Sequence, residues 1–457
     1  MPHWLKTRSF PEVSPMVHTV PQVELGILSG REVVGTFDGG DMSSDGGVVL
    51  VAEAERKLGV IQRMASVIDD RRDPRKVRHG ISEMLAQRVF GIACGYEDCN
   101  DFDDLFRDPA LKVAVGRLPS TGHDLASQPT LSRLENSVGA GELYRMSEVL
   151  VDLFVEGRDQ PPTWVIIDVD ATDDPTHGQQ QLTGFHGYYD EHCYLPLIVT
   201  ARADGGPDEL LATVLRPGRT HAGAGALTVL RRIVARLREA WPEVRIIIRG
   251  DSGFARPEIY DWCERNGIHY LIGLATNNRL RKLAERHLQA ARVEHLLHGE
   301  KVRRLHEGHY AADSWPHQRR VLIKAEVTQQ GDNPRFVVTS LQGDPLLLYD
   351  LYARRGEQEN RIKELKRDLA MDRTSCHRFL ANQFRLLLHS AAFVLLSYVR
   401  KCLAGTELAE AQVCTLQRKL LKLGVLVKQS CRRVWLRFPS SCPVQHLWPL
   451  VLARIRA

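Results

Sequence analysis

The chain has 457 residues, of which 43% are hydrophobic and 26% are charged, so it is long enough for two to four domains with sizeable cores. Its 61 basic and 56 acidic residues give a formal net charge of +5, which permits nucleic-acid binding without demanding it. No apolar run approaches the roughly 18 residues of a membrane span, and the first residues lack the apolar stretch of a secretory signal.

The N-terminal third is predicted to be helical. Residues 1–45 are rich in Pro, Gly and Ser, which predicts a flexible arm that ends at a helix N-cap near Ser44 or Asp45. Between residues 46 and 155 apolar residues recur at helical spacing and strand signals are weak. The pattern therefore predicts an all-helical domain after the arm.

The composition then shifts to short apolar runs that alternate with helices, which predicts an α/β sheet. The runs "WVIIDVD", "CYLPLIVTARAD" and "EVRIIIRGD" are the expected strands of residues 160–275. Residues 276–345 interrupt this rhythm and predict a β-rich insertion, with a hairpin around "QQGDNP". Helices are expected again in residues 346–405, followed by a basic C-terminal segment in residues 406–457.

Carboxylates stand at the ends of two predicted strands. Asp168 and Asp170 lie on the same face of the first strand, because side chains alternate with period two. Asp251 ends a later strand, just before a turn. Ligand sites of α/β sheets favour strand ends, and carboxylates there suit Mg²⁺. A single Asp after a strand is more often a turn former, so these residues alone do not define a site. The nine scattered cysteines contain no CxxC pair, which argues against zinc and disulfides and indicates free thiols in a reducing cytoplasm.

The stretch "YARRGEQENRIKELKRDL", residues 352–369, predicts a helix with two adjoining stripes. At helical spacing its polar stripe contains Tyr352, Arg355, Glu359, Lys363 and Lys366. An apolar stripe of leucines and Ile362 lies beside it and can dock on the sheet. Surface ion pairing of Glu359 with its neighbours four residues away is the alternative to a functional role.

These residues match a known signature. Tyr352, Arg355, Glu359 and Lys366 fit Y-x₂-R-x₃-E-x₆-K without a gap, which resembles the YREK signature of DDE transposases from bacterial insertion sequences. The stretches "DVDATDDPTHGQQQ", "RGDSGFARPEIYDWCERNG" and "LSRLEN" resemble the insertion-sequence-1380 branch of that family. The resemblance covers about residues 30 to 445. It implies an RNase H-like mixed-sheet catalytic core of the α/β class, with a β-rich insertion, preceded by the helical domain.

The resemblance also implies the catalytic residues and their chemistry. Asp170, Asp251 and Glu359 match the three acids of the family, and Asp168 is the alternative for the first. Such acids hold two Mg²⁺ ions, for which Mn²⁺ can substitute, and the ions serve the attacking and leaving oxygens of phosphoryl transfer on DNA. Cleavage at transposon ends would free a 3′-OH that attacks the opposite strand, giving a hairpin, or target DNA. No organic cofactor or membrane is implied, and a homodimer is expected in the synaptic complex.

Several residues are candidates for contacting the end repeats and target DNA. Arg355, Lys363 and Lys366 would bind phosphates, and Tyr352 would donate to a phosphate or stack on a base. Trp315 is a candidate for stacking on a flipped base, although a packed hairpin tryptophan is the commoner situation. Arg432 and Arg433 belong to a C-terminal basic run that suits phosphate contacts, or else line the solvent side of a hairpin. Residues 69–80 and 127–136 of the helical domain are further candidates for binding the repeats.

Two other functions fit the same residues. One is an RNase H-like nuclease without strand transfer, and the other is an inactive DNA-binding regulator. The presence of all three acids disfavours the regulator. A bacterial cytoplasmic protein, bound to the nucleoid when it acts, is expected in each case.

Overall fold

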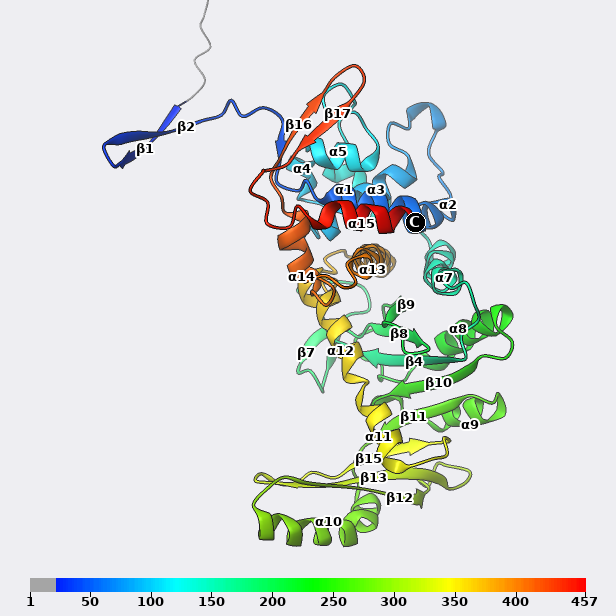
Figure 1. Cartoon of the computed structure of the whole chain (residues 1–457). Helices are drawn as coiled ribbons and strands as arrows, with labels where there is room; N and C mark the ends of the chain where they lie inside the picture. The colour runs from blue at the N-terminus through cyan, green and yellow to red at the C-terminus, as the bar shows by residue number, and fades with distance from the viewer. Residues whose placement is uncertain (1–21) are drawn as a thin grey trace, which may run out of the picture.

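The structure is a computed structural model that describes residues 22–457. Its largest sheet has nine strands in the order β12–β13–β15–β11–β10–β4–β8–β9, with β14 paired to β13 (Figure 1). Strand β10 runs parallel to β4 and to β11, and the other neighbours are antiparallel. The strands are β4 (Trp164–Ala171), β8 (Leu197–Ala203), β9 (Glu209–Val214), β10 (Arg245–Gly250), β11 (His269–Leu274), β12 (Val302–Tyr310), β13 (Arg319–Thr328), β14 (Gly331–Asp332) and β15 (Arg335–Thr339). The predicted mixed α/β fold is therefore confirmed.

The middle of this sheet is buried on both faces. In β10, Ile246 and Ile248 belong to the core under α8 (Ala226–Ala240), α9 (Pro257–Arg265) and α10 (Asn278–His298), whereas Ile247 belongs to the core under α11 (Pro345–Ala353). A run of β-branched residues is typical of such a doubly covered strand. The predicted hairpin of residues 276–345 is present as β13 and β15, and it extends the main sheet beyond β11. Long helix α10 lies on the insertion's strands at the far end of the molecule (Figure 1).

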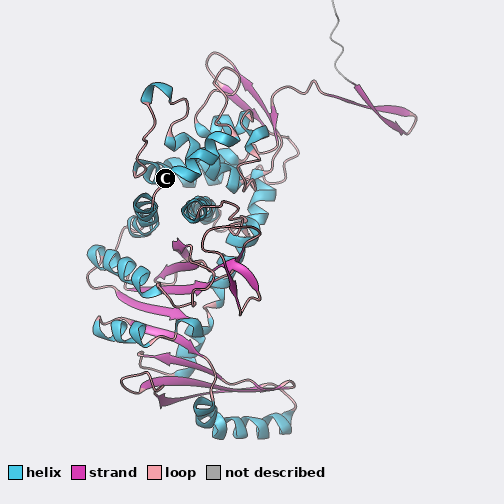
Figure 2. Cartoon of the chain, turned by 180° about the vertical axis from the view of Figure 1, so that it is seen from behind, coloured by secondary structure: helices cyan, strands magenta, loops and turns pink. Residues whose placement is uncertain are grey.

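Helices gather at the opposite end of the molecule (Figure 2). Those of the N-terminal third share one hydrophobic core with α13 (Phe379–Cys402) and α15 (Leu447–Arg456). By length and composition α13 is the one helix of residues 22–457 that could cross a membrane, and the fold buries most of it in this core. The N-terminal helices are α1 (Val48–Leu58), α2 (Val60–Ser66), α3 (Ile81–Ala93), α4 (Phe102–Leu105), α5 (Pro109–Val115), α6 (Gln128–Ser137) and α7 (Ala140–Glu156).

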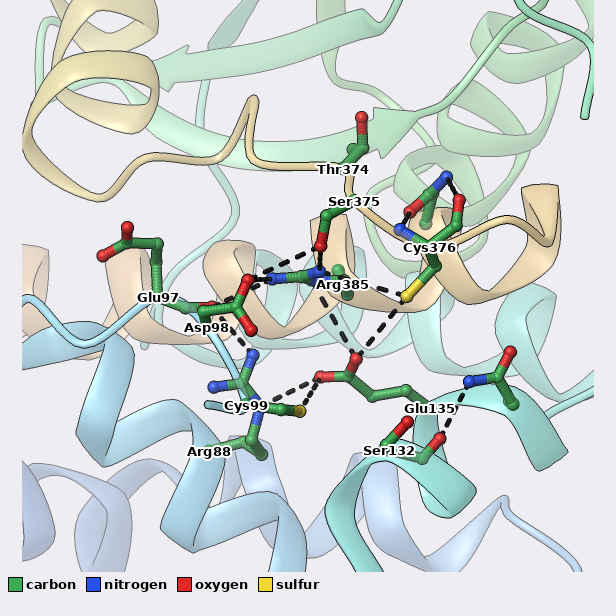
Figure 3. A network of polar contacts seen from close by, with 12 residues as sticks. Arg88, Glu97, Asp98, Cys99, Ser132, Glu135, Thr374, Ser375, Cys376 and Arg385 are labelled. Carbon is green, nitrogen blue, oxygen red and sulfur yellow. Dashed lines mark hydrogen bonds and ion pairs between the residues drawn. The ribbon is translucent and has the colours of Figure 1, made fainter. Parts of the chain in front are cut away.

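A buried ionic network joins these helices to the chain after the sheet (Figure 3). Glu135 of α6 accepts a hydrogen bond from Arg88 of α3 at 2.9 Å and lies 4.0 Å from Arg385 of α13. All three side chains are at most 3% exposed. Arg385 also donates to Asp98 and to the hydroxyl of Ser375. A buried guanidinium needs such partners, because an unpaired charge in the core costs several kcal/mol. Helices α3, α6 and α13 are thereby fixed to one another.

The segments outside the main sheet are small. Strands β1 (Gln22–Leu28) and β2 (Arg31–Thr36) form a hairpin that projects from the body and is exposed along its length (Figure 1). The predicted arm of residues 1–45 lies in part outside the described residues. Strand β3 (Met42–Ser43) pairs with the C-terminal hairpin of β16 (Val425–Gln429) and β17 (Val434–Arg437). Strands β5 (Asp174–Pro175), β7 (Glu191–Tyr194) and β6 (Gly184–His186) form a further small sheet.

The buried imidazole of His389 is expected to make the protein less stable in acid. Burial lowers the pKa of His389 to about 3, from an ordinary value of 6.5. The unfolded chain therefore binds the proton first, and the free energy of unfolding falls as the pH drops from 6.5 towards 3. Urea denaturation across this range should show a weaker acid dependence in His389→Gln. His298→Gln, an exposed control, should behave as the wild type.

Asp174 and Asp170 act in the opposite direction, because burial raises the pKa of each carboxyl in the folded state. Asp174 and Asp170 are present in the wild type and in both variants. The difference in acid dependence between these proteins therefore reports on His389 alone. An unchanged acid dependence in His389→Gln would contradict the prediction.

Candidate active site

Two of the predicted acids lie at neighbouring strand ends. Gly250 of β10 is paired in parallel with Val169 of β4, so Asp251 and Asp170 follow at the same edge of the sheet. The Asp251 carboxylate also accepts a hydrogen bond from the backbone N–H of Gly253 at 2.8 Å, which fixes the turn after the strand. Both side chains remain partly accessible. The expectation that strand ends bring carboxylates together is met for this pair.

Asp168, the alternative first acid, is engaged elsewhere. Its two oxygens accept hydrogen bonds from Nε and Nη2 of Arg249, each at 2.6 Å, and neither side chain is more than 2% exposed. Arg249 is the direct neighbour of Asp168 in the register of β4 and β10. Its Nη1 donates to the carbonyl of Leu351 at 2.5 Å. Asp168 is thus part of a buried ion pair that connects β4 and β10 to α11.

The helix predicted for residues 352–369 is not continuous. Helix α11 ends at Ala353, α12 (Gly356–Lys363) begins after Arg355, and residues 364–368 form a π-helical turn. Tyr352 therefore lies on a different helix from Glu359, and the prediction of one straight polar stripe is wrong. The apolar side of the stretch is buried, but Ile362, Leu365 and Leu369 belong to the helical core and not to the two cores on the faces of the central strands.

The break places Arg355 between two of the acids. Its Nη1 lies 3.1 Å from Oδ2 of Asp170, and its Nη2 lies 2.9 Å from Oε1 of Glu359. The pKa of Asp170 is raised to about 6, chiefly by burial and in part by the charges of Asp251 and Glu359, against the lowering effect of Arg355. The three acids therefore act on one another electrostatically, and the Arg355 guanidinium bridges two of them.

Sequence reasoning missed two residues that make contacts between α12 and the sheet. Gln358 is fully buried, and its side-chain amide donates to the carbonyls of Asp168 at 3.0 Å and Ile198 at 3.4 Å. Arg202 pairs with Glu357 on the outer side of α12. The buried Gln358 amide couples the helix that carries Glu359 to strands β4 and β8, whereas the half-exposed Arg202–Glu357 pair contributes little. Nothing in the local pattern marks Gln358, because its partners lie far away in the sequence.

Tyr352 reaches the same site from α11. A Cβ built on Gly273, at the end of β11, would lie 2.6 Å from the Tyr352 hydroxyl, so glycine at this position leaves room for that hydroxyl. Burial raises the pKa of Tyr352, and the Asp251 charge adds to that effect. The phenol is thus held close to Asp251 and Arg355.

An open pocket lies beside the acids and carries the predicted lysines. It is lined by Asp170, Thr172, Glu359, Lys363 and Lys366, together with Ala171, Ile362, Arg367 and Asp372. Lys366 Nζ lies 3.0 Å from Asp173 and 3.9 Å from Asp372. Lys363 is exposed and has no ion-pair partner within residues 22–457. The pocket therefore presents cations directly next to the carboxylates.

The other predicted DNA contacts lie apart from this pocket. Arg432 and Arg433 are exposed at the turn of the β16–β17 hairpin, which stands at the helical end of the molecule (Figure 1). Trp315 packs edge-on against Tyr260 and Tyr310, with ring centroids 5.2 and 5.4 Å away. Of the arginines of residues 69–80, Arg71, Arg72 and Arg75 pair with aspartates of the same loop. DNA binding by these groups stays a prediction.

A comparison with family models identifies the chain. Residues 25–457 match the model described as transposase DDE domain group 1. The chain belongs to this family. As a DDE transposase it is a metal-dependent enzyme that cleaves DNA and transfers strands. A solved structure of the piggyBac transposase synaptic complex with hairpin DNA is similar at 11% sequence identity and a TM-score of 0.42, covering 83% of this chain and 79% of that one. No curated protein matches the sequence.

The carboxylates of this site are chemically suited to bind divalent metal ions. Carboxylate oxygens are the preferred ligands of Mg²⁺, and Asp170 and Asp251 follow neighbouring parallel strands while Arg355 bridges Asp170 to Glu359. In the arrangement seen for residues 22–457, no three His, Cys, Asp or Glu side chains are close enough to hold an ion. Arg355 takes the space between Asp170 and Glu359, so it has to move before cations can bind there.

Proposed function

We propose that the protein catalyses Mg²⁺-dependent cleavage at transposon ends and transfer of the freed strand into target DNA, through a hairpin intermediate. The observation that carries this proposal is that Asp170 and Asp251 follow neighbouring parallel strands and that Arg355 bridges Asp170 to Glu359, in a chain of the DDE transposase family. Asp170 rather than Asp168 serves as the first acid, because Asp168 is closed off by Arg249. Two Mg²⁺ ions held by the three acids would activate the attacking oxygen and stabilise the leaving oxygen, and Mn²⁺ would substitute.

The remaining residues of the site bind and orient DNA. Lys363 and Lys366 line the pocket beside the acids, where ammonium groups hold phosphates as point charges. Arg355 is placed to leave its carboxylates and form a bidentate contact with a phosphate next to the cleaved bond. Tyr352 donates its hydroxyl to the same strand. Positioning of this kind carries most of the rate in phosphoryl transfer, since the protein supplies no nucleophile.

The strand order supports an RNase H-like catalytic core within this sheet. Strands β9, β8 and β4 are antiparallel neighbours, and β10 and β11 follow on the other side of β4 in parallel. Asp170 and Asp251 lie at the ends of the two central strands, and Glu359 lies on a helix that crosses them. The signature from Tyr352 to Lys366 favours the insertion-sequence-1380 branch. A homodimer on the paired ends and a bacterial cytoplasmic location complete the proposal.

A strand-transfer assay tests this function against that of a nuclease. The terminal repeats that flank the gene are cloned on a supercoiled plasmid and incubated with purified protein and Mg²⁺. Hairpin ends and joined products support the transposase, whereas nicks alone support a nuclease without strand transfer. Binding without any cleavage by the wild type would point to an inactive regulator.

Replacing Arg355 with glutamine is expected to tighten metal binding in the absence of DNA. The guanidinium now neutralises Asp170 and Glu359, and its loss leaves their charge available to a cation. We expect about tenfold stronger Mn²⁺ binding, as for the loss of one competing charge worth about 1.4 kcal/mol. Calorimetric titration of the DNA-free protein with Mn²⁺ measures it.

Lys363→Gln is the matched control, because Lys363 lines the same pocket without pairing with a carboxylate in the described chain. Its effect on Mn²⁺ binding should be small. Equal or weaker Mn²⁺ binding by Arg355→Gln would show that the guanidinium does not compete for the metal position.

A further inference from the structure

A second aromatic feature lies beside the acids, on a segment that the catalytic residues do not use. Strands β6 and β7 form a hairpin whose tip contains Gly187, Tyr188, Tyr189 and Asp190. The Tyr188 side chain is 85% exposed, the highest exposure among the large hydrophobic residues of the described chain. Apart from an edge contact with Tyr189, this ring buries almost no surface in the fold. Its face is therefore free to contact a ligand.

The hairpin is joined to the pocket that carries Asp170 and Glu359: β7 pairs with β5, and Asp173, directly before β5, lies 3.0 Å from Lys366 of that pocket. Burial raises the pKa of Tyr189, and the charges of Asp173, Asp170 and Asp251 add to that effect, so its phenol lies within their electrostatic range. Tyr188 is edge-on to Tyr189, with ring centroids 5.0 Å apart. Tyr189 in turn packs against the His186 ring at 5.1 Å. Tyr189 thus forms the link between the acids and the exposed ring of Tyr188.

The hairpin holds this ring in a defined place. The backbone N–H groups of Tyr189 and Asp190 both donate to the carbonyl of His186, and Asp190 adopts a left-handed φ of 57°. At its base, Gln180 donates to the carbonyl of Thr374 at 2.5 Å, and the N–H of Gln181 donates to that of His377 at 2.9 Å. These bonds tie the hairpin to the loop that follows the π-helical turn. The base is fixed while the tip stays accessible, as a preformed binding platform requires.

A cation stands at the foot of the same hairpin. Arg219 packs against Gly184 of β6, where a Cβ would lie 2.7 Å from its Cγ. Arg219 is exposed, and within residues 22–457 it has no carboxylate partner. An exposed aromatic face together with an unpaired guanidinium fits a nucleotide, whose base stacks and whose phosphate is negative. An acidic protein segment would not need the flat ring.

We propose that the tip of the β6–β7 hairpin is a nucleotide subsite, in which Tyr188 stacks on an unpaired DNA base beside the cleaved phosphodiester and Arg219 contacts the adjacent phosphate. This inference rests on the proposed function, because it needs DNA at the carboxylates. It assigns base stacking to a hairpin between the first two acids. Trp315, by contrast, has its ring packed between two tyrosines.

Stacking is tested with end duplexes that carry 2-aminopurine at each nucleotide around the cleavage site in turn. Wild-type protein should quench the probe at one position, and Tyr188→Ala should restore its fluorescence. Tyr188→Ala should cleave normal duplexes about tenfold more slowly, as expected for one lost base–aromatic stack. Tyr188→Trp should retain both properties. Tyr144→Ala is the control, since Tyr144 is partly exposed on α7 and lies outside the site.

An abasic substrate separates stacking from a general defect. With the base removed at the quenched position, Tyr188→Ala and wild type should cleave at the same rate. Arg219→Ala should lower the slope of log affinity against log salt by about one, as for one lost phosphate contact. The inference is overturned if Tyr188→Ala keeps wild-type quenching and rate, or if its defect is equal on abasic DNA. Cleavage by wild type but not by Asp251→Asn verifies the proposed function separately, whatever Tyr188→Ala does.

Discussion

Replacing Glu359 with glutamine is expected to lower the rate of DNA cleavage by about a thousandfold or more, the upper end of the cost of one transition-state-stabilising group. The amide keeps the shape of the side chain but removes the charge that would hold a cation. Stability should change little, since Glu359 is half-exposed and its partner Arg355 keeps Asp170. A gel assay of end cleavage under single-turnover conditions, with Mg²⁺ in excess, measures the effect.

Glu357→Gln is the matched control, because Glu357 lies on the same helix and pairs with Arg202 away from the pocket. It should cleave at nearly the wild-type rate. If Glu359→Gln cleaves normally while Glu357→Gln does not, the third acid has been assigned to the wrong residue. End-DNA binding, followed by gel shift, should persist in both variants.

Asp168→Asn is expected to destabilise the protein by about 3–5 kcal/mol, the usual cost of breaking a buried ion pair from one side. The substitution leaves the Arg249 guanidinium buried without its carboxylate. Asp170→Asn should cost far less, because its partner Arg355 is partly exposed and keeps Glu359 as a second carboxylate partner. Chemical denaturation measures both variants, and the cleavage assay should show the greater loss in Asp170→Asn.

Asp168 and Asp170 thus allow a structural role to be distinguished from a catalytic one. Cleavage by folded Asp168→Asn, measured below its unfolding transition, should stay within about tenfold of the wild type, the lower range for residues that only support a site. A stable Asp168→Asn that has lost cleavage would instead make Asp168 the first acid.

The position of two candidate acids at strand ends could be predicted from the sequence, because strand ends are local features. Asp170 and Asp251 follow apolar β-branched runs, and the structure places both at the ends of neighbouring parallel strands. The buried stripe of residues 362–369 was equally readable from its spacing. Side-chain period and burial are set by neighbours in the chain, so a pattern reveals them.

The break between α11 and α12 was not predicted, because helical spacing continues across it. Gly356 was its one local signal, since glycine weakens a helix interior. No local pattern in the sequence indicated the partners of Arg249 and Gln358, because those partners come from other strands and helices. The network of Arg88, Glu135 and Arg385 likewise joins residues that only the folded chain brings together.

The network of Arg88, Glu135 and Arg385 affects how the chain folds during synthesis and which truncated forms of it can be stable. Helices α1 to α7 leave the ribosome long before α13, yet they share their core with Phe384, Leu387 and Phe393 of that helix. Until α13 has been synthesised, their apolar faces and the Arg88–Glu135 pair have no cover on that side. A gene copy truncated before α13 therefore encodes a chain with an open core. We expect such a fragment to be degraded by proteases, so that it does not persist as a competitor of the full-length protein.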